Sequence, residues 1–365
     1  MNTSAISPND TNIGISANIL PTLADAPPYL PPIFLEPTLE DFKVQYPVIY
    51  EVSTLHILTN GCLTISTMTL TCDFNTMFHI ENIAKYLLLD INAIYGVKYR
   101  NRDGSEIIRS LVYKKLKNSE KKKKKDFSNQ ITIYVRTTSK TEPINVKLFK
   151  NGALQITGCK CITEFRQAIL VICKCLIKTQ LVFDTNIRHK NIDRTNIEYL
   201  DLEYKSVQTV SFVSNPEELV HNKLNNFSIK MINTNYSLNF VLDRTKIYQI
   251  INKSMEVSPV LGVETKVIDP NIVIVVYDPQ THAGVNIKYR IVETGHVLSI
   301  FCFEEGNIII AGAKNALQIL KGFYFVQKFV RDHYSSIIDI DINEKNRIML
   351  EVLNENLNQK RQLTI

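Results

Sequence analysis

Residues 144–160 read Ile-Asn-Val-Lys-Leu-Phe-Lys-Asn-Gly-Ala-Leu-Gln-Ile-Thr-Gly-Cys-Lys. Apolar or β-branched residues recur at every second position on both sides of Lys150-Asn151-Gly152, as they do in half-buried strands. An Asn-Gly pair supplies the positive φ angles that a tight turn requires. The stretch therefore predicts a β-hairpin that turns at Asn151-Gly152.

The pattern of this hairpin occurs a second time. Residues 298–314 read Leu-Ser-Ile-Phe-Cys-Phe-Glu-Glu-Gly-Asn-Ile-Ile-Ile-Ala-Gly-Ala-Lys. Each copy is followed at once by a helix-like segment, at 162–178 and at 315–333. The chain is therefore interpreted as an internal duplication. The matched positions are Phe149 and Phe303, Gly152 and Gly306, Gly158 and Gly312, and Lys160 and Lys314.

Side chains alternate between the two faces of a strand, so each hairpin has a predicted core face and a second face. The core faces are Val146, Leu148, Leu154 and Ile156 in the first copy and Ile300, Cys302, Ile308 and Ile310 in the second. The second faces are Lys147, Phe149, Gln155 and Thr157, and then Phe301, Phe303, Ile309 and Ala311. The last set is too apolar to meet only water. It indicates either a second buried layer or a binding surface.

The order Phe-x-x-Gly…Thr-Gly-x-Lys at 149–160, matched at 303–314, resembles the TATA-box-binding protein family. The form of the first copy is most similar to the TATA-binding-protein-like factors of large nucleocytoplasmic DNA viruses, and the resemblance covers about residues 60–335. It implies an α+β fold, a saddle of two pseudo-symmetric halves, each a curved antiparallel sheet with two helices on its convex face. The concave face would lie on the minor groove of DNA, where apolar wedges kink the duplex.

The resemblance also implies roles for individual residues. Phe149 and Phe303 would be wedges. Phe127 lies within one residue of the position at which the family has a second wedge phenylalanine in the first half. The family places another wedge in the loop at 279–284, which contains no phenylalanine, so His282 or the neighbouring turn would have to substitute. The groove floor would be lined by Gln155, Thr157, Phe301, Ile309 and Ala311. Asn226 lies close to the position at which the family has an asparagine that reads the minor groove. Phosphates would be neutralised by Lys147, Lys160, Arg290 and Lys314.

The composition is that of a globular chain with a mild basic excess. The 365 residues are 45% hydrophobic, carry a formal net charge of +6 and have a pI of about 8.8, which fits a nucleic-acid partner without requiring one. Seven cysteines form an odd set, which favours reduced thiols. With no secretory signal and no apolar run long enough to span a bilayer, the expected location is the host cytoplasm, in a viral factory, or the nucleus, with packaging in the virion as a further location.

The expected organisation has two halves and three connecting or terminal segments. Residues 1–38 contain a proline cluster and no periodicity, which predicts a disordered arm that is either a passive tail or a docking segment. The halves are expected at 39–180 and 221–336, with a polar, irregular linker at 181–220. The charged, amphipathic residues 337–365 are either a packing helix or a partner-binding appendage.

The five lysines at 121–125 predict a solvated loop that improves solubility, contacts phosphates or directs nuclear import. Periodicity predicts helices capped by Asn75-Thr76, Thr163 and Asp243. The further predicted strands are 62–71, 95–99, 110–117 and 130–136 in the first half, and 226–232, 267–277 and 285–292 in the second.

The sequence offers little for catalysis. It has no Gly-rich phosphate loop, no His-Glu-x-x-His and no Gly-x-Ser-x-Gly, so no enzyme and no cofactor are expected. Cys173 and Cys175 lie two apart on a predicted helix and diverge, so no metal site is expected despite the Cys159-x-Cys161 pair.

The resemblance therefore predicts a transcription initiation factor that binds and bends AT-rich double-stranded DNA and recruits a TFIIB-like factor and RNA polymerase subunits. The alternative is a protein-interaction scaffold of the same fold that does not bend DNA sharply.

Overall fold

The computed structural model describes residues 36–101, 103–112, 129–139, 142–188, 201–255 and 268–339, together with 344, 346, 347 and 349–351. The first half of the repeat contributes β1 (Thr64–Asp73), β2 (Ile94–Arg100), β3 (Glu106–Ser110), β4 (Gln130–Val135), β5 (Ile144–Phe149) and β6 (Ala153–Cys159). The second half contributes β9 (Asn225–Ser237), β10 (Ile272–Val276), β11 (Val285–Ile291), β12 (His296–Cys302) and β13 (Asn307–Ala313).

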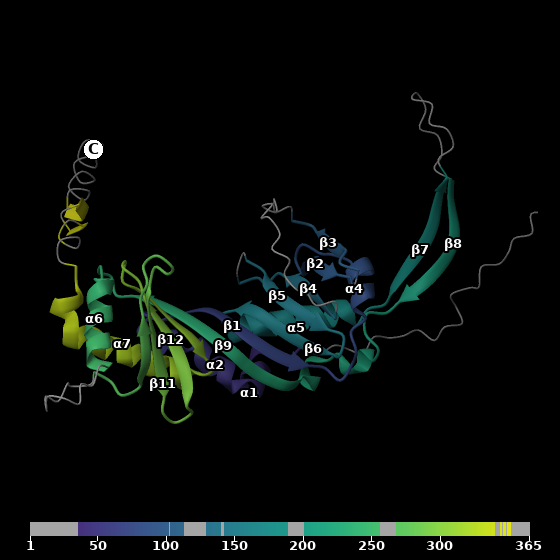
Figure 1. Ribbon diagram of the computed structural model, residues 1–365. Coiled ribbons are helices and arrows are strands. Elements are labelled where there is room, and N and C mark those ends of the chain that lie inside the picture. The colour runs from purple at the N-terminus through teal and green to yellow at the C-terminus, as the bar shows by residue number, and fades with distance from the viewer. Residues whose placement is uncertain are drawn as a thin grey trace, which may run out of the picture. The chain divides into compact units, whose positions relative to one another are not determined.

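These strands form one antiparallel sheet in the order β10-β11-β12-β13-β9-β1-β6-β5-β4-β2-β3 (Figure 1). The two central strands, β1 and β9, pair with each other, and Met68 lies opposite Ile232. Outward from this pair each half repeats the same strand order, so β6 corresponds to β13, β5 to β12, β4 to β11 and β2 to β10. Strand β3 extends the first half and has no counterpart among the described strands of the second. The predicted α+β class with two equivalent halves is confirmed.

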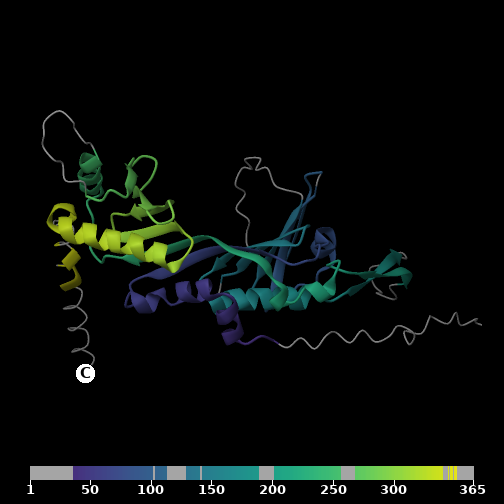
Figure 2. The ribbon, with the colours of Figure 1, turned by 90° about the horizontal axis from the view of Figure 1, so that it is seen from below.

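The helices pack on one face of the sheet. They are α1 (Leu39–Gln45), α2 (Pro47–Ser53), α3 (Leu55–Leu58), α4 (Ile80–Tyr86), α5 (Ile162–Leu176), α6 (Arg244–Met255) and α7 (Ala316–Ile337). Helix α5 packs on β6 and β2, α7 packs on β13 and β11, and α2 contacts both α5 and α7. Figure 2 shows α7, α5 and the N-terminal helices on the same side of the strands. Both predicted core faces are buried against them, with Val146 and Ile300 at 0% exposure.

The two hairpins use the same local contacts. The Gly152 N–H donates to the Phe149 carbonyl at 3.0 Å, and the Gly306 N–H donates to the Phe303 carbonyl at 3.1 Å. Gly152 has a φ of +90°, whereas Asn151 does not lie in the left-handed region, so the prediction that both residues of the pair supply positive φ is wrong for Asn151. A left-handed glycine after an ordinary residue closes the turn instead.

Two predicted helix caps are wrong, and one predicted strand has different bounds. Helix α4 begins at Ile80, and the Thr76 hydroxyl accepts from the Asn215 N–H at 2.9 Å instead of capping the helix. Helix α5 has Cys161 rather than Thr163 at its N-cap. The strand expected to begin at residue 110 is β3, which spans Glu106–Ser110, and residues 113–117 of the expected strand lie outside the described residues. The cap at Asp243 is confirmed, because its Oδ1 accepts from the Lys246 N–H at 3.0 Å.

The segment expected to be an irregular linker is partly regular. Strands β7 (Gln180–Arg188) and β8 (Asp201–Val210) pair antiparallel as a separate two-stranded sheet, so the prediction of irregular structure is wrong for these residues. Short 3-10 turns follow at Pro216–Glu218 and His221–Lys223. The predictions made for the arm before residue 36, for the lysine run at 121–125 and for Phe127 lie outside the described residues.

Candidate nucleic-acid interface

The sheet face opposite the helices, here called the open face, carries the second-face residues of both hairpins. Cross-strand pairing arranges them in rows. In the first half Thr132, Lys147, Gln155, Thr71 and Ser228 follow one another across β4, β5, β6, β1 and β9. In the second half the corresponding row is Asn286, Phe301, Ile309, Asn235 and Thr64. The first row is therefore polar throughout, whereas the second has two apolar residues, Phe301 and Ile309, at places where the first has Lys147 and Gln155.

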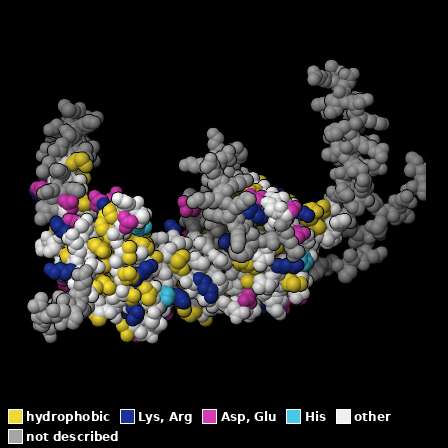
Figure 3. Space-filling model, in the orientation of Figure 1, with side chains coloured by type: hydrophobic (Ala, Val, Ile, Leu, Met, Phe, Trp, Pro, Cys, Tyr) yellow, Lys and Arg dark blue, Asp and Glu magenta, His cyan; other side chains and the backbone are white. Residues whose placement is uncertain are grey.

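The open face of the second half is apolar and accessible. Ile274 is 47% exposed and Val276 is 48% exposed on β10, and Met231 on β9 is 37% exposed. Figure 3 shows hydrophobic side chains gathered over β11 and β12 with lysines and arginines among them. A covering layer would not leave these side chains about half exposed. Of the two alternatives for the apolar face, the exposure favours a binding surface.

The loop that lacks the family's phenylalanine places a histidine beside the two aromatic residues of this half. The ring centroid of His282 lies 5.3 Å from that of Phe301 and 6.1 Å from that of Phe303. Gly284 allows the Phe303 ring to lie against the loop backbone, since a Cβ at Gly284 would be 3.0 Å from Phe303 Cε1. The half-buried Phe303 ring is thus held at the edge of the open face.

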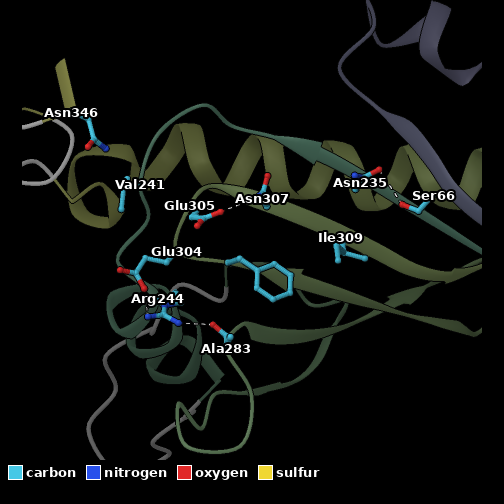
Figure 4. Close-up of a pocket in the computed structure, with 11 residues that line it drawn as sticks. Ser66, Asn235, Val241, Arg244, Ala283, Glu304, Glu305, Asn307, Ile309 and Asn346 are labelled. Carbon is cyan, nitrogen blue, oxygen red and sulfur yellow. Dashed lines mark hydrogen bonds and ion pairs between the residues drawn. The ribbon is translucent and has the colours of Figure 1, made fainter. Parts of the chain in front are cut away.

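A hollow of about 860 Å³ opens next to Phe303. Figure 4 shows Ser66 and Asn235 at one side of it, Ile309 on its floor, and Arg244 and Glu304 at the opposite side. Arg244 forms an ion pair with Glu304 and donates to the Ala283 carbonyl at 2.6 Å. The hollow is therefore apolar on its floor and hydrogen-bonding on its rim.

A comparison with curated proteins gives the family. The chain is 32% identical over 301 residues to the "TATA-box-binding protein-like" protein of Acanthamoeba polyphaga mimivirus, a match that covers 81% of this chain and 72% of the relative. The chain belongs to the TATA-box-binding-protein-like family. No protein-family model matches it. Among solved structures it is similar to Methanococcus jannaschii TBP, with 13% identity, 74% of this chain and 98% of that chain covered, and a TM-score of 0.38.

Within this TATA-box-binding-protein-like chain, Lys147 lies in the polar row of the first half, whereas the other predicted cations lie at the margins of the open face. Lys160 and Lys314 are exposed and occupy equivalent places, each where a strand passes into a helix. The Lys160 N–H donates to Glu164 Oε2 at 2.7 Å, and the Lys314 N–H donates to Gln318 Oε1 at 2.8 Å. The backbone at both lysines is thereby fixed while the ammonium groups remain in solvent.

Arg290 is exposed on β11, and the sequence analysis missed a neighbour with the same orientation. Lys288 lies two residues earlier on the same strand face, opposite Ser299, and its Nζ donates to Ser299 Oγ at 2.7 Å. Strand alternation from Arg290 would have been sufficient to find it.

Asn226 lies apart from the other candidate residues. It is exposed at the start of β9 with a φ of +49°, and its Nδ2 donates to Asp73 Oδ2 at 2.9 Å. Asp73, Glu218 and Asn222 line the same shallow hollow. The structure therefore directs this amide toward a carboxylate and does not bring it together with the floor residues.

The cysteines are free thiols, and several belong to the core. Burial raises the pKa of the Cys302 thiol to about 12 and that of Cys72 to about 12, so both stay protonated at neutral pH. Within the described parts of the chain, no three His, Cys, Asp or Glu side chains are grouped closely enough to hold a metal ion. None of the described helices is long and apolar enough to cross a membrane.

Proposed function

We propose that the protein is a transcription initiation factor that binds AT-rich promoter DNA through the minor groove and bends it. The observation that carries the proposal is the placement of Phe149 and Phe303. They stand at equivalent ends of two repeated hairpins, on the same open face, and both are only half buried. Aromatic rings on an accessible face match side chains that insert between base steps.

The floor between these residues suits A·T pairs. The minor-groove edge of an A·T pair carries only acceptors, whereas guanine adds a projecting amino group. Apolar side chains such as Phe301 and Ile309 can approach the smooth A·T floor, but they leave the guanine amino group without a partner. Bending would let both halves of the sheet contact the groove, because a kinked duplex exposes a widened groove to more protein surface.

The helix face would remain available to the transcription machinery. Val44, Ile57 and Leu58 on the N-terminal helices are 82%, 63% and 62% exposed. This surface supports recruitment of a TFIIB-like factor and RNA polymerase subunits, in a viral factory or the nucleus, while the open face holds DNA.

A fluorescence bend assay tests the proposal. Dyes at both ends of a short AT-rich duplex report its end-to-end distance, and a GC-rich duplex serves as the control. A third duplex replaces every A·T pair by inosine·cytosine, which changes the major groove but presents no guanine amino group in the minor groove. We expect shortening with the AT-rich and inosine duplexes and none with the GC-rich one. Binding without shortening would favour the non-bending scaffold, and no binding to any duplex would contradict the proposal.

Charge removal at the margins should weaken the salt dependence of binding. Lys160→Gln, Arg290→Gln and Lys314→Gln each remove one cation that we place on a phosphate. Each is expected to lower the slope of log K against log salt by about 1. Lys85→Gln on α4, an exposed lysine of the helix face, is the matched control and should leave the slope unchanged. If all four variants keep the slope of the wild type, DNA does not contact these margins of the open face.

A further inference from the structure

Asn235 has an unusual hydrogen-bond arrangement on the open face. Its Oδ1 accepts from Thr64 Oγ1 at 2.6 Å and from Ser66 Oγ at 3.0 Å, both on the neighbouring strand β1. Figure 4 draws the bond to Ser66 at the rim of the hollow that Phe303 and Ile309 also line. Two hydroxyl groups therefore converge on one end of the Asn235 amide.

The end of the amide that faces the hydroxyls is the oxygen, Oδ1. Thr64 Oγ1 also donates to the Asn235 backbone carbonyl oxygen at 3.2 Å, so this hydroxyl lies between two acceptors of Asn235. The Nδ2 group then points away from β1. Asn235 is exposed, and in the described part of the chain no hydrogen bond occupies its two Nδ2 protons. The residue thus presents fixed donors to whatever covers the open face.

The position of Asn235 in the sheet places these donors over the floor. Asn235 pairs with Ile309 on one side and Thr64 on the other, as Thr71 in the first half pairs with Gln155 and Ser228. Its neighbours on β1 are short side chains, which allow a ligand to approach the amide closely. The first-half counterpart, Thr71, carries a hydroxyl and not an amide, so the two halves differ at this point.

We infer that Asn235 is a base-reading residue that donates from Nδ2 to one acceptor on the minor-groove floor, N3 of adenine or O2 of thymine. Thr64 and Ser66 are positioning residues that keep the amide in the donating orientation. A G·C pair at this step would bring its amino donor against the amide donors and would be disfavoured. Because Thr71 has a shorter side chain, with a single hydroxyl donor in place of the amide, the two halves would contact the groove differently, and Asn235 would give the complex a preferred direction on its site. The inference rests on the proposed function.

Single-atom changes in the DNA test the contact. In an AT-rich duplex one adenine at a time is replaced by 3-deazaadenine, which lacks the N3 acceptor, or one thymine by 2-thiothymine, whose sulfur is a poor acceptor. For the wild type, we expect affinity to fall about fivefold at one position, the effect of one net hydrogen bond. Asn235→Ala should bind the unmodified duplex about fivefold more weakly and show no further loss at that position, while its response at every other position is unchanged.

Two further variants complete the design. Asn92→Ala removes an exposed asparagine that lies between α4 and β2 and does not line the hollow, and it should behave like the wild type. The double variant Thr64→Val, Ser66→Ala keeps Asn235 but frees its amide, so the loss at the reading position should shrink without disappearing. Thermal melts establish that each variant is folded.

The outcomes separate this inference from the proposed function. If the wild type binds no duplex, the proposed function fails. If the wild type binds but Asn235→Ala keeps the full position-dependent loss, minor-groove binding stands and the role of Asn235 is overturned. An unchanged loss in the Thr64, Ser66 double variant would overturn the positioning role of the hydroxyls.

Discussion

The double variant Phe149→Ala, Phe303→Ala is expected to bind AT-rich DNA about a hundredfold more weakly and to leave the duplex straight. A wedge ring would stack on a base, and replacing a base-stacked aromatic residue by alanine costs about 1–3 kcal/mol, so each substitution should lose about 1.5 kcal/mol of binding free energy. Together that is about 3 kcal/mol, or roughly two factors of ten in the dissociation constant. The bend assay and a titration on the same labelled duplex measure both effects.

The control for this double variant is Tyr324→Ala. Tyr324 is 59% exposed on α7, on the helix face, so its loss removes an accessible aromatic ring without touching the open face. It should bind and bend DNA like the wild type. If the double variant also retains wild-type affinity and shortening, the two phenylalanines are not wedges, and contact must depend on other parts of the open face.

The parts of the fold that the sequence predicts well are those specified by neighbouring residues. Alternation at 144–160 and 298–314 is a local signal, and it placed Lys147 and Phe301 on the open face and Val146 and Ile300 in the core as the structure has them. The helices after both hairpins are confirmed because an apolar stripe at helical spacing also needs no distant partner.

The misses have a common physical cause. Thr76 looked like a helix cap, but its hydroxyl accepts from Asn215, which lies 139 residues away. Residues 201–210 were expected to belong to a polar linker, yet backbone pairing with β7 makes them strand β8. Strand formation depends on a partner's backbone more than on composition, so a sequence window alone could not decide it.

Asn235 shows the same limit at the candidate interface. The resemblance directed attention to Asn226, whose amide faces Asp73. The orientation of Asn235 depends on Thr64 and Ser66, 171 and 169 residues away, which meet it only because β1 and β9 pair at the centre of the sheet. Alternation along a strand predicts which face of the sheet a side chain occupies. It does not predict whether the oxygen or the nitrogen of an asparagine side chain faces the neighbouring strand.

Gly152→Ala is expected to lower the free energy of unfolding by about 3 kcal/mol or more, the largest stability effect of a single methyl group that the two hairpins offer. Gly152 has a φ of +90°, and a Cβ there would lie closer than 3.0 Å to the carbonyl oxygens of Thr76 and Phe74. The left-handed backbone accounts for about 1–2 kcal/mol of the loss, and displacement of the packed backbone accounts for the rest. Urea unfolding followed by circular dichroism measures it.

Gly295→Ala separates the two contributions. Gly295 also has a positive φ, +66°, but nothing lies within 4 Å of a Cβ built there, so this variant should lose only about 1 kcal/mol, the cost of the backbone conformation. Gly306→Ala should resemble Gly152→Ala, because its Cβ would lie closer than 3.0 Å to the Phe240 carbonyl oxygen. The two glycines occupy equivalent turns that begin at Phe149 and Phe303. Similar losses at 152 and 306 and a small loss at 295 are therefore the result that the duplication requires. Equal, small losses at all three positions would mean that the turns are not packed against the segments that follow β1 and β9.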